Sequence, residues 1–280
     1  MPETAESGRR VVTEDQSDQM PRINSRVATI ARIYDYWLGG KDNFEADRTA
    51  GDAMIEQYPD IVRGVRLNRA FLGRAVHYLA AEAGIRQFLD IGTGLPSSNN
   101  THEVAQKTAP ESRIVYVDND PIVLNHAQAL LTSTREGACA YVDADIRDTG
   151  KILKDAANVL DFSRPVAVCL IMILQFIPDE DDPVSIVRAL VDAIPSGSYL
   201  TVAHPASDVD QHVGPALRQL STRMGGTRAV PRSHQEVSRF FDGLEMVEPG
   251  LVQLHRWRPG TGLDDTGRDL AAYGAVARKP

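Results

Sequence analysis

The chain has 280 residues, of which 42% are hydrophobic, and 38 Asp and Glu outnumber 30 Lys and Arg to give a net charge of −8. This apolar share supports a real core and argues against a disordered or coiled-coil chain. The acidic balance disfavours broad, non-specific nucleic-acid binding, which requires a basic face.

The sequence favours a cytoplasmic protein with no membrane segment. Its longest apolar run, residues 166–174, is too short for a bilayer, which takes about 20 residues. The polar N-terminus lacks the apolar segment of a secretory signal. Cys139 and Cys169 lie in apolar segments, as expected of buried free thiols in a reducing compartment.

The first 86 residues predict a tail and a helical cover. Residues 1–21 are acidic with few large apolar side chains, which is typical of a mobile tail. Over 22–86, apolar residues such as Ile30, Ile33, Tyr34 and Trp37 recur at helix spacing, and Gly39-Gly40 interrupts the pattern. We therefore expect a cover over 22–86 and a core domain over 87–280.

From residue 87 onwards, strand and helix patterns alternate. Five apolar segments read as strands, and Asp-Pro pairs at 120–121 and 182–183 each open a helix. Ser233 and Glu236 form a capping box for a further helix. The alternation predicts an α/β fold with a doubly wound, Rossmann-like sheet. The five strand segments are 88–92, 113–117, 138–142, 166–171 and 199–203, and two late ones, 251–257 and 273–277, would finish the sheet with an antiparallel edge.

A glycine turn follows the first predicted strand, where such a sheet binds its ligands. The sequence there is Asp90-Ile91-Gly92-Thr93-Gly94, and the third glycine of the dinucleotide fingerprint is replaced by Ser97. The pattern is therefore D-x-G-x-G. An amino-acid moiety carries an ammonium group that needs an acceptor, and Asp90 can provide one directly or through water.

Two more carboxylates follow the next two strands. Asp118 ends the second strand, where an acidic residue accepts hydrogen bonds from a ribose diol. After the third strand, Asp145 can accept from an exocyclic adenine amine while Ile146 packs on the ring. Asn119 contacts ribose or adenine, or only shapes the turn.

This ordered set resembles the class I S-adenosylmethionine-dependent methyltransferases. A narrower resemblance is to the actinobacterial S-adenosyl methyltransferase family, once classed as a domain of unknown function. It rests on the segments 34–44 (Tyr-Asp-Tyr-Trp-Leu-Gly-Gly-Lys-Asp-Asn-Phe), 88–96, 102–106 and 115–121, and it covers the chain from about residue 25 to the end. The resemblance implies a seven-stranded cofactor-binding sheet and a helical N-terminal cover, but no substrate.

Several other residues are candidates for the site. Two glycines between helices suit a lid hinge, which would fold four side chains over the cofactor: Tyr34, Tyr36, Trp37 and Asn43. The alternative is a plain helix break. In this fold the methyl group and the acceptor lie after the fourth strand, which places Ile171 at the cofactor and makes Gln175 a weak catalytic candidate or a surface residue. His204 follows the fifth strand and is a weak candidate for a general base, although a lone histidine is more often structural.

The function expected is in-line methyl transfer from S-adenosylmethionine to an unidentified, small-molecule acceptor, with S-adenosylhomocysteine as product. A regulatory or partner protein that binds the cofactor without turnover is the alternative. Asp90 and Ser97 argue against an NAD-dependent oxidoreductase, and residues 173–176 lack the Pro-Pro-aromatic motif of amino-methylating nucleic-acid enzymes. No metal is expected, because Gln106 stands where a zinc-binding H-E-x-x-H needs its second histidine. The oligomeric state, including a homodimer, is left open.

Overall fold

The computed structural model describes residues 24–123, 133–225, 228–260 and 267–280. The predicted tail, 1–21, lies outside these residues, as does most of the helix predicted from Asp120-Pro121 onwards. Within the described ranges, no helix is long and apolar enough to cross a membrane.

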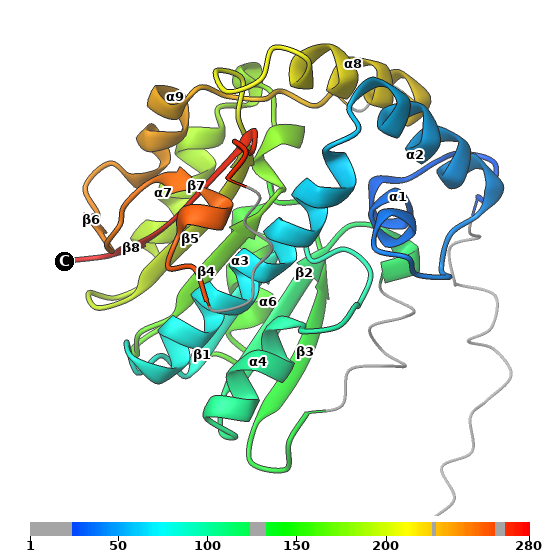
Figure 1. Cartoon of the computed structure of the whole chain (residues 1–280). Helices are drawn as coiled ribbons and strands as arrows, with labels where there is room; N and C mark the ends of the chain where they lie inside the picture. Colours follow the sequence, from blue (N-terminus) through cyan, green and yellow to red (C-terminus); the bar gives the residue numbers. More distant parts are fainter. Residues whose placement is uncertain (1–23, 124–132, 226–227, 261–266) are drawn as a thin grey trace, which may run out of the picture.

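A central sheet organises the core (Figure 1), in the order β3-β2-β1-β4-β5-β8-β6, with β7 paired to β8. The predicted doubly wound α/β fold is confirmed. The order reverses between β1 and β4, and such a switch point is where open sheets bind ligands, at the carboxyl ends of their strands. The five parallel strands are β1 (Gln87–Ile91), β2 (Arg113–Asp118), β3 (Ala138–Asp143), β4 (Ala167–Ile171) and β5 (Tyr199–Pro205).

The end of the sheet differs from the sequence prediction. The strand predicted over 273–277 is β8 (Ala272–Arg278), antiparallel to β5. The prediction of a strand over 251–257 is correct only for β7 (Val252–Gln253) and is wrong for the residues after it. A 3-10 turn, Leu254–Arg256, follows β7 and places Leu254 and Trp257 in the core against Phe71. The described sheet has eight strands instead of the seven expected. The additional strand, β6 (Glu245–Met246), is exposed and carries no apolar pattern that could have predicted it.

Helices cover both faces of the sheet. Alternate strand residues, such as Phe88 and Leu89, are buried in different clusters, one on each face. One face packs against α3 (Ile61–Ala81) and α4 (Thr101–Thr108), and the other against α6 (Thr149–Ala156), α7 (Pro183–Asp192) and α9 (His234–Ser238). The predicted caps of the last two are confirmed, because Asp182 accepts from the Ser185 amide and Ser233 and Glu236 form their capping box.

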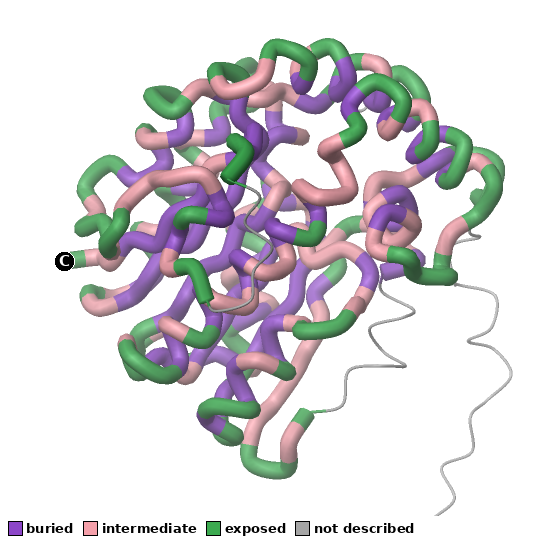
Figure 2. Tube along the Cα trace, in the orientation of Figure 1, coloured by how far each residue is buried: buried purple, intermediate pink, exposed green. Residues whose placement is uncertain are grey.

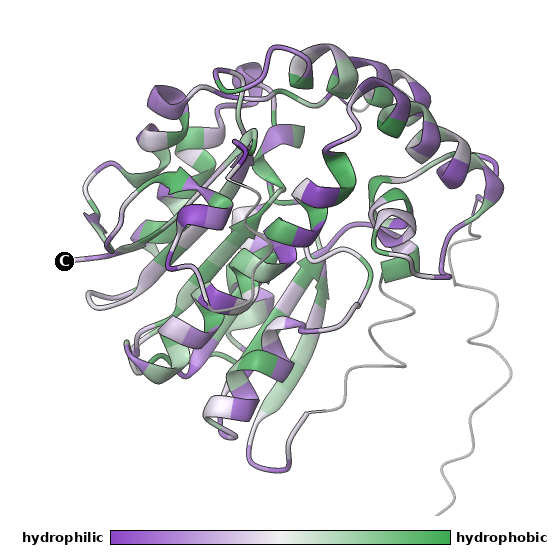
Figure 3. Cartoon of the chain, in the orientation of Figure 1, coloured by the Kyte–Doolittle hydropathy of each residue, from purple (hydrophilic) through white to green (hydrophobic). Residues whose placement is uncertain are grey.

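The cover lies over the carboxyl ends of the strands. It contains α1 (Ile30–Trp37), α2 (Glu45–Gln57), the start of α3 and also α8 (Val213–Arg223), which the sequence did not assign to it. Exposed residues run along α2 and α8, whereas the central strands β1, β4 and β5 are buried and the edge strand β3 is mostly of intermediate exposure (Figure 2). Hydrophobic residues are concentrated in the strands (Figure 3). The helix α3 continues from the cover onto the sheet and contributes buried residues to both.

Candidate active site

A cavity of about 810 Å³ lies between the cover and the carboxyl ends of β1 to β4. Its size is within the range of pockets that enclose small ligands. The structure brings together at its wall all of the residues that the sequence assigned to the cofactor: Asp90, Gly92, Thr93, Gly94, Asp118, Asn119, Asp145, Ile146 and Ile171.

The glycine turn needs its glycines for conformation. Gly92 and Gly94 have φ angles of 77° and 66°, a region that side chains other than glycine rarely adopt. A Cβ on Gly92 would lie 2.6 Å from the Ile173 side chain, whereas one on Gly94 would meet nothing within 4 Å. The Thr93 hydroxyl donates to the carbonyls of Asp90 and Val117 at 3.2 and 3.3 Å. The turn is thus fixed to both strands, and Gly94 leaves the backbone open to a ligand.

Asp118 joins the end of β2 to this turn. Its Oδ2 accepts from the Gly94 amide at 2.7 Å, and its Oδ1 accepts from the amides of Asn119 and Asp120 at 2.9 and 3.0 Å. Burial raises the pKa of Asp118, and the three amide hydrogen bonds oppose that rise. The carboxylate therefore has a fixed orientation at the cavity wall.

Asp90 is a buried carboxylate at the end of β1. Its Oδ2 accepts from the Thr101 hydroxyl at 2.6 Å. Burial raises the pKa of Asp90 to about 6, against the opposing effects of the Thr101 hydrogen bond and of the nearby Arg69. A carboxylate whose charge is poorly solvated and which faces a cavity is suited to a cationic ligand group.

Asp145 lies near the other end of this row of carboxylates. It accepts from the Asn119 side-chain amide at 3.1 Å, and Arg147 donates to both of its oxygens at 3.1 Å. Arg147 also donates to Asp181 at 2.9 Å. The half-exposed carboxylate thus has its orientation set by an amide and a guanidinium.

Two of the four lid candidates reach the cavity. Tyr34 and Trp37 lie three residues apart on one face of α1 and line the wall. Tyr34 accepts a hydrogen bond from the Asn68 amide at 2.7 Å, and burial raises its pKa. Tyr36 and Asn43 do not line the cavity: the first donates to Asp52 at 2.6 Å, and the second donates to the lining residue Asp35 at 2.8 Å.

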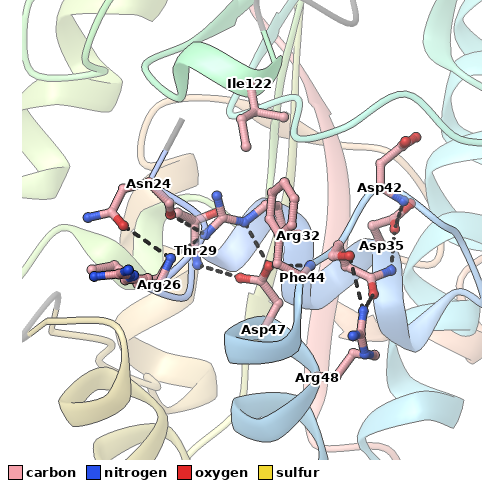
Figure 4. A network of polar contacts seen from close by, with 12 residues as sticks. Asn24, Arg26, Thr29, Arg32, Asp35, Asp42, Phe44, Asp47, Arg48 and Ile122 are labelled. Carbon is pink, nitrogen blue, oxygen red and sulfur yellow. Dashed lines mark hydrogen bonds and ion pairs between the residues drawn. The ribbon is translucent and has the colours of Figure 1, made fainter. Parts of the chain in front are cut away.

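A buried ion pair fixes the cover (Figure 4). Arg32 of α1 lies 2.8 Å from Asp47 of α2, and both side chains are inaccessible to solvent. Asp47 also accepts from the amides of Thr29 and Phe44 at 3.0 and 2.8 Å, while the Arg32 guanidinium lies over the Phe44 ring. The backbone entering α1 and α2 is therefore held by one carboxylate. No local sequence pattern indicates this pair, since charged residues at helix spacing are normally exposed.

The two catalytic candidates differ in their surroundings. His204 is fully buried, with Nδ1 2.9 Å from the Pro205 carbonyl and Nε2 3.0 Å from the Arg232 guanidinium, and it does not line the cavity. Burial lowers its pKa to about 3, so this geometry does not support a general base. Gln175 does line the cavity: its Nε2 donates to the Met172 carbonyl at 2.8 Å, and its buried Oε1 has no partner among the described residues.

Asn68, Arg69 and Met172 are among the residues at this wall that sequence reasoning missed. Asn68 and Arg69 face the cavity from α3, and Arg69 donates to the carbonyls of Ser98 and Asn99 at 3.0 Å. Met172 follows β4 with a φ of 54°, a left-handed conformation found at functional sites. No local pattern marks the first two, because only the packing of α3 on the sheet brings them there. Among the described residues, no group of three or more His, Cys, Asp or Glu could hold a metal ion.

Comparison with known proteins decides the family. Residues 16–280 match the family model of the S-adenosyl methyltransferases. The chain belongs to this family. No curated protein matches the chain.

Solved structures agree with this membership. A DUF574-family protein from Streptomyces avermitilis is 52% identical, with a TM-score of 0.89 over 92% of this chain and 100% of the other. A methyltransferase candidate from Thermobifida fusca is 39% identical, with a TM-score of 0.83 over 91% and 96%. The plantazolicin methyltransferase BpumL, solved with S-adenosylhomocysteine, is 10% identical with a TM-score of 0.50 over 89% and 95%, which shows a shared fold alone.

The cofactor of this S-adenosyl methyltransferase is S-adenosylmethionine, and the residues present fit it. The cofactor has a cationic amino-acid end, a ribose diol and an adenine. The cavity provides a buried carboxylate at Asp90, an oriented carboxylate at Asp118 and an acceptor beside an apolar residue at Asp145 and Ile146. The open space beside Gly94 leaves room for the cofactor to approach the protein backbone.

Proposed function

We propose that the protein transfers the methyl group to a small-molecule acceptor enclosed under the cover. One observation carries this proposal: the strand-end carboxylates and the inner faces of the cover helices line one continuous cavity. Such a cavity can hold cofactor and acceptor together and shield them from water. We also infer a cytoplasmic setting from the two free cysteines, Cys139 and Cys169.

We assign the cofactor contacts to the row of carboxylates. Asp118 would accept from the ribose diol, and Asp145 from the adenine amine, with Ile146 against the ring. Asp90 would pair with the ammonium group. The amide hydrogen bonds to Asp118 fix the direction of its lone pairs before the ligand arrives, which lowers the ordering cost of binding.

The chain's contribution to the reaction is positioning and exclusion of water. When bound, the cofactor would supply an electrophilic methyl group, to which the acceptor would bond as the carbon–sulfur bond breaks and a neutral thioether leaves. Tyr34 and Trp37 of the cover and Ile171 and Gln175 after β4 would fix the acceptor in line. Catalysis by positioning and exclusion of water requires no dedicated base for acceptors whose proton leaves after attack.

A cofactor-binding protein without turnover is a second candidate. It is favoured by the position of His204, whose ring nitrogens are both engaged away from the cavity. Both candidates predict cofactor binding, and they differ in whether S-adenosylhomocysteine accumulates.

The test is product formation. The protein is incubated with methyl-labelled S-adenosylmethionine and pools of phenols, alcohols and amines, and S-adenosylhomocysteine is quantified by mass spectrometry. We expect at least one pool to yield product above the uncatalysed background, and Asp118→Ala to lower that yield at least tenfold at subsaturating cofactor. Tight cofactor binding with no product from any pool would favour the protein without turnover.

A further inference from the structure

We propose that the acceptor is a neutral, largely apolar molecule that presents a hydrogen-bond donor. This inference rests on the proposed function and names the class of substrate for the same cavity. The cofactor carboxylates leave one half of the cavity free, and the side chains of that half select the acceptor.

The sheet order divides the cavity into two halves. Asp118 and Asp145 follow β2 and β3, on one side of β1. On the other side of β1, the carboxyl ends of β4 and β5 face α1, α2 and α8 of the cover. A cofactor held by the carboxylates therefore leaves the β4–β5 half for the acceptor.

The wall of the β4–β5 half is apolar. It is formed by buried side chains from the four cover helices and from the segment after α8. The six that define it are Trp37, Met54, Val65, Leu217, Leu220 and Met224. Because burying a charge against such a wall without a partner is costly, a charged acceptor is disfavoured.

Two charged side chains in this half, Asp35 and Arg228, are both hydrogen-bonded, and Arg228 is also ion-paired. Among the described lining residues there, Asp35 accepts from the Asp42 amide and from Asn43 at 2.9 and 2.8 Å. Arg228 is exposed and pairs with Glu180 at 2.9 Å. Arg228 is therefore compensated by a carboxylate, whereas both donors to Asp35 are neutral, so the cost of burying a charge at the apolar wall is what disfavours an ionised acceptor.

Gln175 and Asn68, which both line the cavity, each carry a buried amide oxygen that has no partner among the described residues. The Gln175 Nε2 donates to the Met172 carbonyl, which leaves Oε1 as an acceptor only. Asn68 donates Nδ2 to the Tyr34 hydroxyl, and its Oδ1 is likewise unpartnered. A buried acceptor without a donor is unfavourable, so a bound molecule that brings an O–H or N–H would be selected.

The experiment uses four matched naphthalene probes and the full chain. Saturation with S-adenosylhomocysteine is first verified calorimetrically, and a failure there would count against the proposed function and not against the acceptor class. Then 1-naphthol, 1-methoxynaphthalene, 1-naphthoate and 1-naphthylmethylammonium are titrated into the loaded protein. We expect 1-naphthol to bind about tenfold more tightly than each of the others.

Variants locate the effect. In Gln175→Leu, the preference for 1-naphthol over 1-methoxynaphthalene is expected to fall to less than threefold, while the exposed control Gln57→Leu retains it. The comparison of probes in the unaltered protein stands even if Gln175→Leu fails to fold. Equal or tighter binding of the anion, the cation or the methyl ether overturns the proposal, as does no binding of any probe at 1 mM to protein saturated with S-adenosylhomocysteine.

Discussion

At the scale of single residues, Asp90 shows how a binding site differs from a stable core. Its carboxylate is buried and receives one side-chain hydrogen bond, from Thr101. The folded protein therefore holds a charge in an unfavourable place at neutral pH, which raises the pKa of Asp90 to about 6. A cationic ligand group would relieve this cost, which links cofactor affinity to an instability of the free protein.

Substitution of Asp90 by asparagine is expected to stabilise the free protein at pH 8. The pKa of Asp90 is raised on folding, so the charge costs stability above the folded value of about 6 and that cost fades as the pH falls towards 3.8. Asp90→Asn should therefore gain about 1–3 kcal/mol at pH 8 and about half as much at pH 5. Urea denaturation at the two pH values measures this gain.

The same variant should bind S-adenosylhomocysteine at least tenfold more weakly, because the ammonium group loses its counter-ion. A variant that is less stable than the parent protein at pH 8, or one with unchanged affinity, would contradict the role given to Asp90.

At the scale of elements, the turn after β1 carries the site. Its backbone takes left-handed conformations at Gly92 and Gly94, but the two glycines face different surroundings. Gly92 is packed against Ile173, whereas Gly94 faces open space at the cavity wall. Gly92 is therefore needed mainly for folding, and Gly94 is needed mainly for ligand binding.

Alanine at the two positions should separate these needs. Gly92→Ala combines a left-handed alanine with a clash and is expected to lose about 2–4 kcal/mol of unfolding free energy. Gly94→Ala has the conformational cost alone, about 1–2 kcal/mol, and should weaken S-adenosylhomocysteine binding at least tenfold because its Cβ occupies ligand space. Denaturation and calorimetry test both, and equal stability losses would contradict the distinction.

The elements of the core were predictable because their signals are local. Each apolar run and each Asp-Pro or Ser-x-x-Glu cap is contained within a few consecutive residues. The strands β1 to β5 and the helices α7 and α9 match these signals. The 3-10 turn at Leu254–Arg256 was missed because packing against α3 decides it. In the short β6, Met246 is exposed, so no apolar pattern could indicate the strand.

At the scale of the whole molecule, the cavity exists because distant segments meet. Strand-end carboxylates could be predicted, since the ends of parallel strands converge at one edge of a sheet. Asn68 and Arg69 could not, nor could the participation of α8, because their positions depend on how α3 and α8 pack over that edge. Tyr36 and Asn43 belong to the same sequence segment as Tyr34, but tertiary packing places their side chains outside the cavity wall.

The assignment of the cofactor to the strand-end carboxylates is tested by calorimetric titration of S-adenosylhomocysteine into the protein and into Asp118→Ala, with NAD as the control ligand. We expect micromolar binding to the parent protein, none of NAD, and at least a tenfold loss in the variant, since hydrogen bonds to a charged acceptor contribute about 1.5–3 kcal/mol. Circular dichroism confirms that the variant is folded. Unchanged affinity in a folded Asp118→Ala, or binding of NAD in place of S-adenosylhomocysteine, would contradict the assignment of the cofactor to these strand-end carboxylates.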